Sequence, residues 1–154
     1  MTASPIVGRL AAGAIVVGIA ACSPAGPLPT ADAVTWTATL PGDPRTLDDL
    51  LAIARAAHQP VWIELTAAWC AACRIVDQGA YRDPDVVRAA RRFLTIRIDT
   101  TAGDPLTTAL ATRLAATGLP TLMFVGADGT PLADRRVVGT IAAPELVATL
   151  AEVR

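Results

Sequence analysis

The pattern of hydrophobic and polar positions predicts alternating strands and helices from about residue 34 onward. Short runs in which apolar side chains alternate or dominate indicate strands. We expect these strands over residues 34–40, 60–66, 93–99, 121–125 and 135–138. The last two are joined through Asp128-Gly129, a dipeptide typical of hairpin turns.

Helices are predicted between these strands from capping residues and apolar stripes at helical spacing. Thr46 can cap the first helix, and Asp83-Pro84 and Asp104-Pro105 each combine a capping carboxylate with proline at the first helical position. We expect helices over residues 46–57, 83–92 and 104–116, the last stopped near Gly118, with two more that open at Cys70 and Pro144. This order predicts an α/β fold: a central mixed sheet, largely parallel, with helices on both faces and an antiparallel hairpin at its end.

Composition and charge leave the predicted fold unchanged but argue against two classes of protein, nucleic-acid-binding proteins and disulfide-rich miniproteins. A length of 154 residues gives room for one ordinary domain. Lysine and arginine number 13 against 14 aspartate and glutamate residues, so the net charge is -1 at pH 7. A nearly neutral chain argues against nucleic acid as a partner. The 3 cysteines are too few for a miniprotein held together by disulfides.

The N-terminal residues have the pattern of an export signal. Arg9 precedes an uncharged run, residues 10–21, which suits a signal peptide and is too short to span a bilayer comfortably. The run ends in Ile19-Ala20-Ala21-Cys22, which resembles the lipobox of bacterial lipoproteins. In such signals the cysteine thiol receives a diacylglycerol and the peptide bond before it is cut, so Cys22 is the predicted lipid-attachment site. An ordinary cleaved signal with a chance cysteine and an uncleaved anchor remain alternatives.

The predicted organisation has three parts, residues 1–21, 22–42 and 43–154. A signal peptide of lipoprotein type is followed by the lipidated cysteine with a proline-rich linker, and then by the folded domain. Each interpretation of the signal places the folded domain outside the cytoplasm. The lipoprotein interpretation anchors it to a membrane of the cell envelope, on the periplasmic side.

The pair in Cys70-Ala71-Ala72-Cys73 follows directly on a predicted strand and opens a helix. Because residues i and i+3 share a helical face, the two thiols lie within disulfide range. Cys70 is the predicted nucleophile, since free N–H groups and the helix dipole favour a thiolate there, and Cys73 is the predicted resolving thiol. The alternatives are half of a zinc site and an inert structural disulfide. Only His58 and Cys22 remain as further soft ligands, and the bridge closes too short a loop to stabilise much, so redox use is favoured.

The residues around this pair resemble a known family. The segment from Trp62 to Cys73, followed far downstream by Gly118-Leu119-Pro120-Thr121, is similar to the thioredoxin superfamily. More narrowly it resembles the C-terminal periplasmic thioredoxin-like domain of the DsbD family of thiol:disulfide interchange proteins, which shares Asp83-Pro84 after the active-site helix. The resemblance covers about residues 45–150. It implies a thioredoxin-like fold and a thiol:disulfide oxidoreductase activity.

The resemblance also assigns single residues by position. Glu64 matches a carboxylate buried beneath the active site, Asp77 a second acidic residue near it, and Pro120 the cis-proline that faces an extended substrate. Trp69 and Leu119 lie beside these positions and are expected at the substrate-binding surface. A carboxylate inside a buried strand costs several kcal/mol unless it is paired or used. This favours a proton-transfer role for Glu64 over a merely tolerated buried acid.

Two departures from the family pattern bear on the site. The residues between the cysteines are Ala71-Ala72 rather than the Gly-Pro of common thioredoxins. The lysine that thioredoxins place near the buried acid falls at Thr95. Glu64 is therefore expected to lack that cationic partner.

We therefore expect an extracytoplasmic reductant that passes electrons to protein disulfides. No histidine lies between the cysteines, and Glu64 and Asp77 add negative charge that opposes a thiolate. The expected partners are disulfide-bearing client proteins, a separate membrane thiol conduit as electron donor, and the membrane through the lipid anchor. No metal or cofactor is expected besides the redox-active pair Cys70 and Cys73. The alternatives are a net oxidase or isomerase, and a lipid-anchored binding module that uses the thioredoxin groove without turnover.

Overall fold

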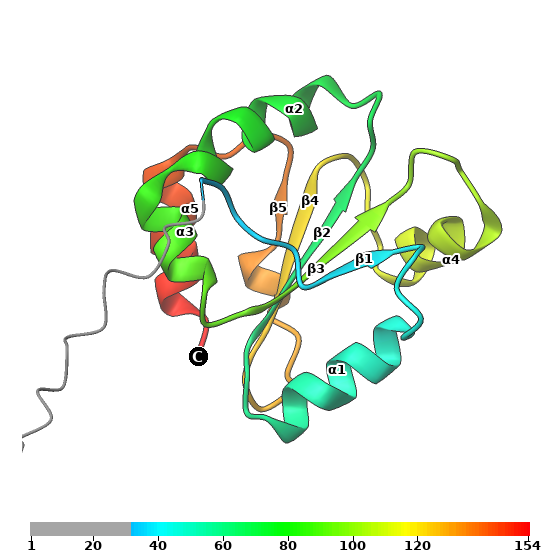
Figure 1. The fold of residues 1–154 in the computed structure, drawn as a ribbon, viewed down its shortest axis with the longest axis horizontal. Coiled ribbons are helices and arrows are strands. Elements are labelled where there is room, and N and C mark those ends of the chain that lie inside the picture. The colour runs from blue at the N-terminus through cyan, green and yellow to red at the C-terminus, as the bar shows by residue number, and fades with distance from the viewer. Residues whose placement is uncertain (1–31) are drawn as a thin grey trace, which may run out of the picture. The chain divides into compact units, whose positions relative to one another are not determined.

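A five-stranded sheet in the order β1-β3-β2-β4-β5 forms the centre of residues 32–154, the part of the chain that the computed structural model describes (Figure 1). The strands are β1 Ala38–Leu40, β2 Val61–Thr66, β3 Leu94–Asp99, β4 Thr121–Val125 and β5 Val137–Val138. β1 and β2 each run parallel to β3, whereas β4 is antiparallel to both β2 and β5. The sheet is therefore mixed, as predicted.

Helices cover both faces of this sheet (Figure 1). They are α1 Leu47–Ala56, α2 Ala71–Gln78, α3 Pro84–Ala90, α4 Pro105–Arg113 and α5 Ala143–Glu152, with two 3-10 helices, η1 Ala80–Arg82 and η2 Ala133–Arg135. α1 and α4 pack on one face, and α2, α3 and α5 pack on the other. The predicted α/β fold with helices on both faces is confirmed.

Three helices begin at the residues that the sequence indicates. The Thr46 hydroxyl accepts a hydrogen bond from the Asp49 amide at 3.1 Å, and the Asp49 carboxylate accepts one from the Thr46 amide at 2.9 Å. This reciprocal pair is a capping box at the start of α1. Asp83 and Asp104 each accept from two backbone amides, with proline in the first turn of α3 and α4. The caps satisfy amides that have no partner within the helix.

Alternation along β2 divides the interior into two layers. Val61, Ile63 and Leu65 belong to the cluster beneath α1 and α4, whereas Trp62 belongs to the cluster beneath α2, α3 and α5. All residues of the strand are buried, Glu64 included. β2 is therefore a central strand held from both sides, which fixes the direction of the segment that follows it.

α4 ends earlier than predicted. Its last residue is Arg113, and Ala115 takes up the left-handed conformation with φ of 49°. The prediction of a helix to residue 116, stopped by Gly118, was wrong because a non-glycine residue occupies the left-handed position that glycine usually takes. Gly118 lies instead against β5, where an added Cβ would be 3.2 Å from Cγ1 of Val138.

The last strand is shorter than predicted, and the connection before it is wider. The Asp128-Gly129 segment turns, and the Thr130 amide donates to Asp128 Oδ1 at 2.8 Å. Pro131 forms an isolated bridge with Val125, residues 133–135 then form η2, and the strand itself is limited to Val137–Val138, which pair with β4. Arg136 donates to the carbonyl of Ala115 at 2.7 Å, which holds the chain after η2 to the turn that follows α4.

β1 lies before residue 43, the predicted start of the folded domain. It pairs with β3 from Ala38 to Leu40, so the sheet extends into the segment interpreted as linker. The predicted signal peptide and Cys22 lie outside the described residues. None of the helices in residues 32–154 is long and apolar enough to cross a membrane.

Candidate active site

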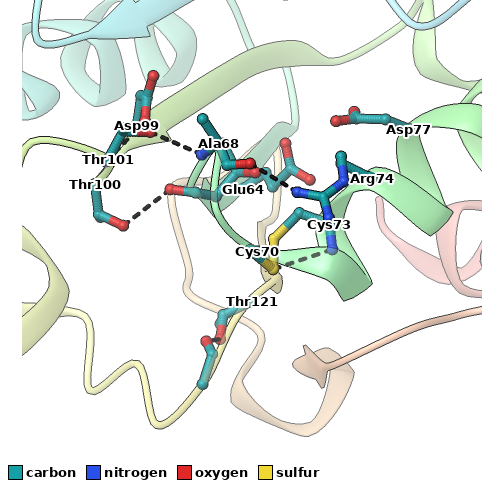
Figure 2. Close-up of a disulfide and its surroundings, with 12 residues drawn as sticks. Glu64, Ala68, Cys70, Cys73, Arg74, Asp77, Asp99, Thr100, Thr101 and Thr121 are labelled. Atoms are coloured by element: carbon teal, nitrogen blue, oxygen red, sulfur yellow. Dashed lines mark hydrogen bonds between the residues drawn. A yellow bond between two sulfur atoms is a disulfide. The ribbon is translucent and has the colours of Figure 1, made fainter.

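A disulfide joins Cys70 to Cys73 where β2 gives way to α2 (Figure 2). Cys70 is the N-cap of α2, and its sulfur accepts a hydrogen bond from the Cys73 amide at 3.0 Å. The two Cα atoms are 5.3 Å apart, within the ordinary range for a disulfide. The helix N-terminus thus presents amides and the positive end of its dipole to the Cys70 sulfur, where they favour a thiolate once the bond is reduced.

The two cysteines differ in their access to solvent. Cys70 is 7% exposed and Cys73 is 1% exposed. The neighbouring Trp69 is 66% exposed, so a large apolar side chain stands at the surface directly before the more accessible sulfur. This difference supports Cys70 as the attacking thiol and Cys73 as the resolving thiol.

The loop before β4 brings the other predicted substrate-binding residues to the disulfide. Leu119 packs against the cluster that contains Cys70 and Cys73. The Leu119–Pro120 peptide bond is cis, and Pro120 is buried. The Pro120 carbonyl accepts a hydrogen bond from the Gly139 amide at 2.8 Å, which ties this loop to the chain after β5.

Glu64 is fully buried on β2, and both of its carboxylate oxygens are bonded. The Tyr81 hydroxyl donates to Oε1 at 2.8 Å, and Arg97 Nε donates to Oε2 at 2.7 Å. Glu64 therefore lacks the lysine of thioredoxins, as expected, but it does have a cationic partner. Thr95, where the family's lysine was expected to fall, donates its hydroxyl to the carbonyl of Thr35. The cation comes instead from Arg97, which lies directly opposite Glu64 in the parallel register.

Arg97 also joins Glu64 to the second predicted acid. Its Nη2 donates to Asp77 Oδ1 at 2.6 Å, and the centre of the guanidinium lies 4.4 Å from the centroid of the Trp36 ring. Side-chain exposure rises from 0% for Glu64 to 20% for Arg97 and 38% for Asp77. Glu64, Tyr81, Arg97 and Asp77 form what we call the acid–arginine cluster. It leads from the buried carboxylate to the protein surface, and Figure 2 shows Glu64 and Asp77 on the strand and helix that flank the disulfide.

Burial raises the pKa of Glu64 from its usual 4.5 to about 7, against the opposing effects of the Arg97 charge and the Tyr81 hydrogen bond. Burial and the nearby Glu64 charge raise the pKa of Tyr81 well above 10.0, so its hydroxyl keeps its proton and acts as a donor. A carboxyl group whose pKa is near neutrality both accepts and releases protons efficiently at neutral pH. Glu64 is therefore suited to exchange a proton with the thiol pair.

Sequence reasoning missed Arg97, Tyr81 and Trp36 as parts of this site. For Arg97 a signal exists, because a charged residue within an apolar strand needs a buried partner and parallel pairing brings Arg97 onto the face of Glu64. Tyr81 gives no such signal. It lies in η1, a short 3-10 turn between α2 and α3 that no apolar periodicity indicates.

The arrangement provides what thiol–disulfide exchange requires. It has a sulfur at a helix N-terminus that belongs to the more exposed cysteine of the pair, a second sulfur on the more deeply buried cysteine, and a buried acid with a pKa near neutrality. Across residues 32–154, no three His, Cys, Asp or Glu side chains come together in a group that could hold a metal ion. The expectation that no cofactor is bound stays a prediction.

Known proteins of related sequence are thiol:disulfide interchange proteins. A family model described as thioredoxin-like matches residues 43–127. DsbD of Klebsiella pneumoniae is 38% identical over 88 residues, and DsbD 2 of Pseudomonas aeruginosa is 34% identical over 116 residues. These alignments cover 57% and 75% of this chain, but only 15% and 20% of the relatives. The chain therefore matches a small part of each DsbD protein.

Solved structures agree on the fold. The C-terminal domain of Neisseria meningitidis DsbD in its reduced form matches with a TM-score of 0.61 at 24% identity, over 70% of this chain and 94% of that domain. A thioredoxin from Thermus thermophilus matches with a TM-score of 0.62 at 22% identity, over 79% of this chain and 87% of that protein. At these identities the likeness shows a shared thioredoxin-like arrangement of strands and helices.

Proposed function

The chain belongs to the thioredoxin-like family, and from this premise we propose that it is a thiol:disulfide oxidoreductase that reduces client proteins outside the cytoplasm. The observation that carries the proposal is the Cys70–Cys73 disulfide at the N-terminus of α2, with Glu64 buried nearby. A purely structural bridge between residues i and i+3 closes too short a loop to stabilise the fold much. It also gives no reason for a buried acid with a pKa near neutrality.

The reaction begins with the reduced pair. The Cys70 thiolate attacks one sulfur of a client disulfide and forms a Cys70–client bond, while the other client sulfur leaves as a thiolate and takes up a proton. The Cys73 amide, which bonds to the Cys70 sulfur at 3.0 Å in the oxidised protein, lies where it can stabilise the negative charge of the attacking thiolate. The exposed Trp69 and the Leu119–Pro120 loop border this sulfur and provide the surface that receives the client.

Cys73 then resolves the mixed disulfide. Its thiol gives a proton to Glu64, and the resulting thiolate attacks the Cys70 sulfur, so that the Cys70–client bond breaks and the second client sulfur leaves as a thiolate. In all, two electrons pass from the cysteine pair to the client, and the Cys70–Cys73 disulfide remains. The first client thiolate takes its proton from solvent, which received the Cys70 proton, and Glu64 passes the Cys73 proton on to the second client thiolate. Because Cys73 is only 1% exposed, water has little access to it, and an internal base is the natural acceptor of its proton.

The charges around Cys70 favour a reductant. The residues between the cysteines are alanines, and no histidine is there to stabilise a thiolate. Arg97 balances one of the two carboxylates, so the acid–arginine cluster has a net charge between zero and -1 as Glu64 titrates. A site of this kind gives the thiolate little extra stabilisation, and strong oxidants depend on that stabilisation.

The proposed place of work is a membrane surface of the cell envelope, on the periplasmic side. The order of Arg9, the uncharged run and Cys22 supports export followed by lipidation, with the proline-rich segment as a linker. A separate membrane thiol conduit returns electrons to the Cys70–Cys73 disulfide, and no bound cofactor is needed because the cysteine pair holds the electrons. Cys22→Ser is expected to release the protein from membranes or block its processing. Mass spectrometry of the native N-terminus decides the point, since an unmodified Cys22 contradicts the lipid anchor.

The test of activity uses the full-length chain, a chemical dithiol as electron source and a disulfide-bonded model protein as client. The wild-type chain is expected to accelerate reduction, and Cys70→Ser to abolish the acceleration. Cys73→Ser is expected to accumulate a mixed disulfide with the client, because Cys70 still attacks and nothing resolves the product. If Cys70→Ser retains function in cells, the redox proposal is wrong and a binding role replaces it.

The direction of electron flow has its own measurement. Equilibration of the Cys70–Cys73 pair against a glutathione buffer gives its reduction potential. We expect a value nearer the roughly −270 mV of thioredoxin than the roughly −120 mV of a strong oxidant. A value above about −150 mV would assign the protein to the oxidases.

A further inference from the structure

The reaction steps above assign no task to Arg97, the central residue of the acid–arginine cluster. It lies on β3, in register with Glu64, and among residues 32–154 it alone bonds to both acids: Nε to Glu64 at 2.7 Å and Nη2 to Asp77 at 2.6 Å. Its third contact is with the Trp36 ring, 4.4 Å from the ring centroid. Two edges and one face of the guanidinium are thus occupied, which fixes its orientation.

We propose that Arg97 is a positioning residue for thiol exchange, which holds the Glu64 carboxylate in place and supplies the positive charge that its ionised form needs, while Asp77 limits this effect by sharing the same guanidinium. This inference rests on the proposed function and deepens it. The pair Glu64 and Cys73 carries out the proton transfer, and Arg97 acts through Glu64 without touching the reacting sulfurs.

The geometry of the cluster carries this proposal. A planar guanidinium can bond two carboxylates through different nitrogens at the same time, whereas an ammonium is a single point of charge. The groups that face Glu64 come from three elements: Arg97 from β3, Tyr81 from η1, and Asp77 from α2 through Arg97. Of these, only Arg97 brings a positive charge to a carboxylate that is wholly buried.

The two charged neighbours of Glu64 act on it in opposite directions. The Arg97 charge lowers the pKa of Glu64 from the value that burial alone would give, and the Asp77 charge raises it. Removing Arg97 and removing the charge of Asp77 therefore have opposite consequences for the pH at which Glu64 can accept the Cys73 proton. A purely structural link between β2 and α2 predicts no such opposition, because loss of either partner would only loosen the site.

The experiment uses stopped-flow mixing of the reduced full-length chain with an aromatic disulfide whose thiolate product is coloured. Attack by Cys70 releases the first coloured thiolate, and attack by Cys73 on the mixed disulfide releases the second. The rate of the second release is measured against pH and is expected to fall on the acid side. The midpoint of this fall, called the acid limb, reports the pKa of the group that accepts the Cys73 proton. Infrared titration of the protonated Glu64 carboxyl band, assigned by its loss in Glu64→Gln, measures the same protonation without any thiol chemistry.

Arg97→Met is expected to move both the acid limb and the infrared titration to higher pH by about one to three units, the usual effect of removing a close opposite charge. Asp77→Asn is expected to move both to lower pH. In Arg97→Lys both pH values are expected to lie between those of Arg97→Met and of the wild type, because lysine keeps the charge and loses the bridge between Glu64 and Asp77. Arg113→Met, which removes an arginine from an exposed ion pair with Asp48, is the matched control and is expected to move neither.

Each outcome decides the inference. If the limb stays unmoved in both Arg97→Met and Asp77→Asn, or moves in the same direction in both, Arg97 is only structural. If the infrared titration moves and the limb does not, Arg97 tunes Glu64 but has no part in exchange, and the inference is equally overturned. Should Arg97→Met fail to fold, Arg97→Lys and Asp77→Asn still give the opposed comparison. A wild-type chain that releases no coloured thiolate refutes the proposed function itself, which separates that failure from this one.

Discussion

On the face of the sheet covered by α1 and α4, β2 and β3 contribute only aliphatic side chains, whereas on the opposite face the same strands contribute Trp62, Glu64, Thr95 and Arg97. The aliphatic set from the two strands is Val61, Ile63, Leu65, Leu94, Ile96 and Ile98. Because successive side chains of a strand point to opposite faces, one pair of strands builds both layers. The buried aliphatic side chains on one face stabilise the sheet. The opposite face of the same strands can therefore hold ionisable groups.

The second face surrounds its charges with aromatic rings. Trp36 and Trp62 meet edge to face with centroids 5.5 Å apart, and Trp62 and Tyr81 meet at 5.3 Å. These rings exclude water from Glu64 while Arg97 lies over the face of Trp36. The low polarity around the carboxylate raises its pKa toward neutrality. The aromatic packing that stabilises this face therefore also determines how Glu64 titrates.

The largest expected effect lies on the aliphatic face. Leu50 is a fully buried residue of α1, and Leu50→Ala removes side-chain volume that its neighbours cannot refill. We expect a loss of about 2–5 kcal/mol in the free energy of unfolding, measured with denaturant on the oxidised protein. The pH dependence of thiol exchange is expected to stay as in the wild type. A shifted pH profile in this variant would show that the two faces are coupled.

The second effect is a pH dependence of stability that arises from Glu64. Its pKa is about 7 in the folded protein and near 4.5 when exposed, so between these values the folded chain holds a proton that the unfolded chain has released. Stability contributed by this group therefore falls as pH rises through that window, by about 3 kcal/mol in total. Glu64→Gln abolishes the effect, so the free energy of unfolding of this variant is expected to rise relative to that of the wild type between about pH 4.5 and about pH 7.

Unfolding curves of both proteins at several pH values measure this difference, with the disulfide intact. Asp85→Asn, at an exposed carboxylate of α3, is the control and is expected to follow the wild type. Exchange by Glu64→Gln is expected to be slower near neutral pH, because Cys73 loses its proton acceptor. Equal pH slopes for wild type and Glu64→Gln would contradict the raised pKa.

A smaller effect is expected from Tyr81→Phe. The change removes the hydroxyl that donates to Glu64 Oε1 at 2.8 Å and leaves the aromatic ring in place. The ionised carboxylate loses a hydrogen bond, which costs about 1.5 kcal/mol above pH 7 and less where Glu64 is protonated. The acid limb of exchange is expected to move slightly to higher pH, in the same direction as for Arg97→Met. A limb displaced to lower pH would exclude Tyr81 as a donor to the carboxylate.

The smallest effect is expected at the surface of the aliphatic side, where Arg113 of α4 and Asp48 of α1 form an exposed ion pair. Arg113 Nη1 donates to Asp48 Oδ2 at 2.9 Å, but water and salt screen both groups. Arg113→Met is expected to leave stability within the error of an unfolding measurement and exchange unchanged. A large loss of stability in this variant would mean that the pair, rather than Leu50 and its neighbours, joins α1 to α4.

Local signals in the sequence determined the elements and the redox motif. Thr46, Asp83 and Asp104 mark helix starts because a side-chain oxygen caps amides two or three residues away, and this needs no other part of the fold. The same holds for the Cys70 and Cys73 pair, whose spacing within one helical turn brings the sulfurs together. Period-two alternation likewise placed Glu64 on a buried strand before any partner was known.

The partners of Glu64 were decided by the tertiary structure alone. Arg97 is 33 residues away along the chain and Tyr81 is 17 away, so no pattern within one helix or strand joins them to the carboxylate. The first contact depends on the register between β2 and β3, and the second on a short 3-10 turn packed beneath the sheet. A carboxylate's charge state follows from burial and neighbouring charges together. The sequence therefore placed the acid, and only the assembled sheet supplied the arginine and the hydroxyl that determine how it titrates.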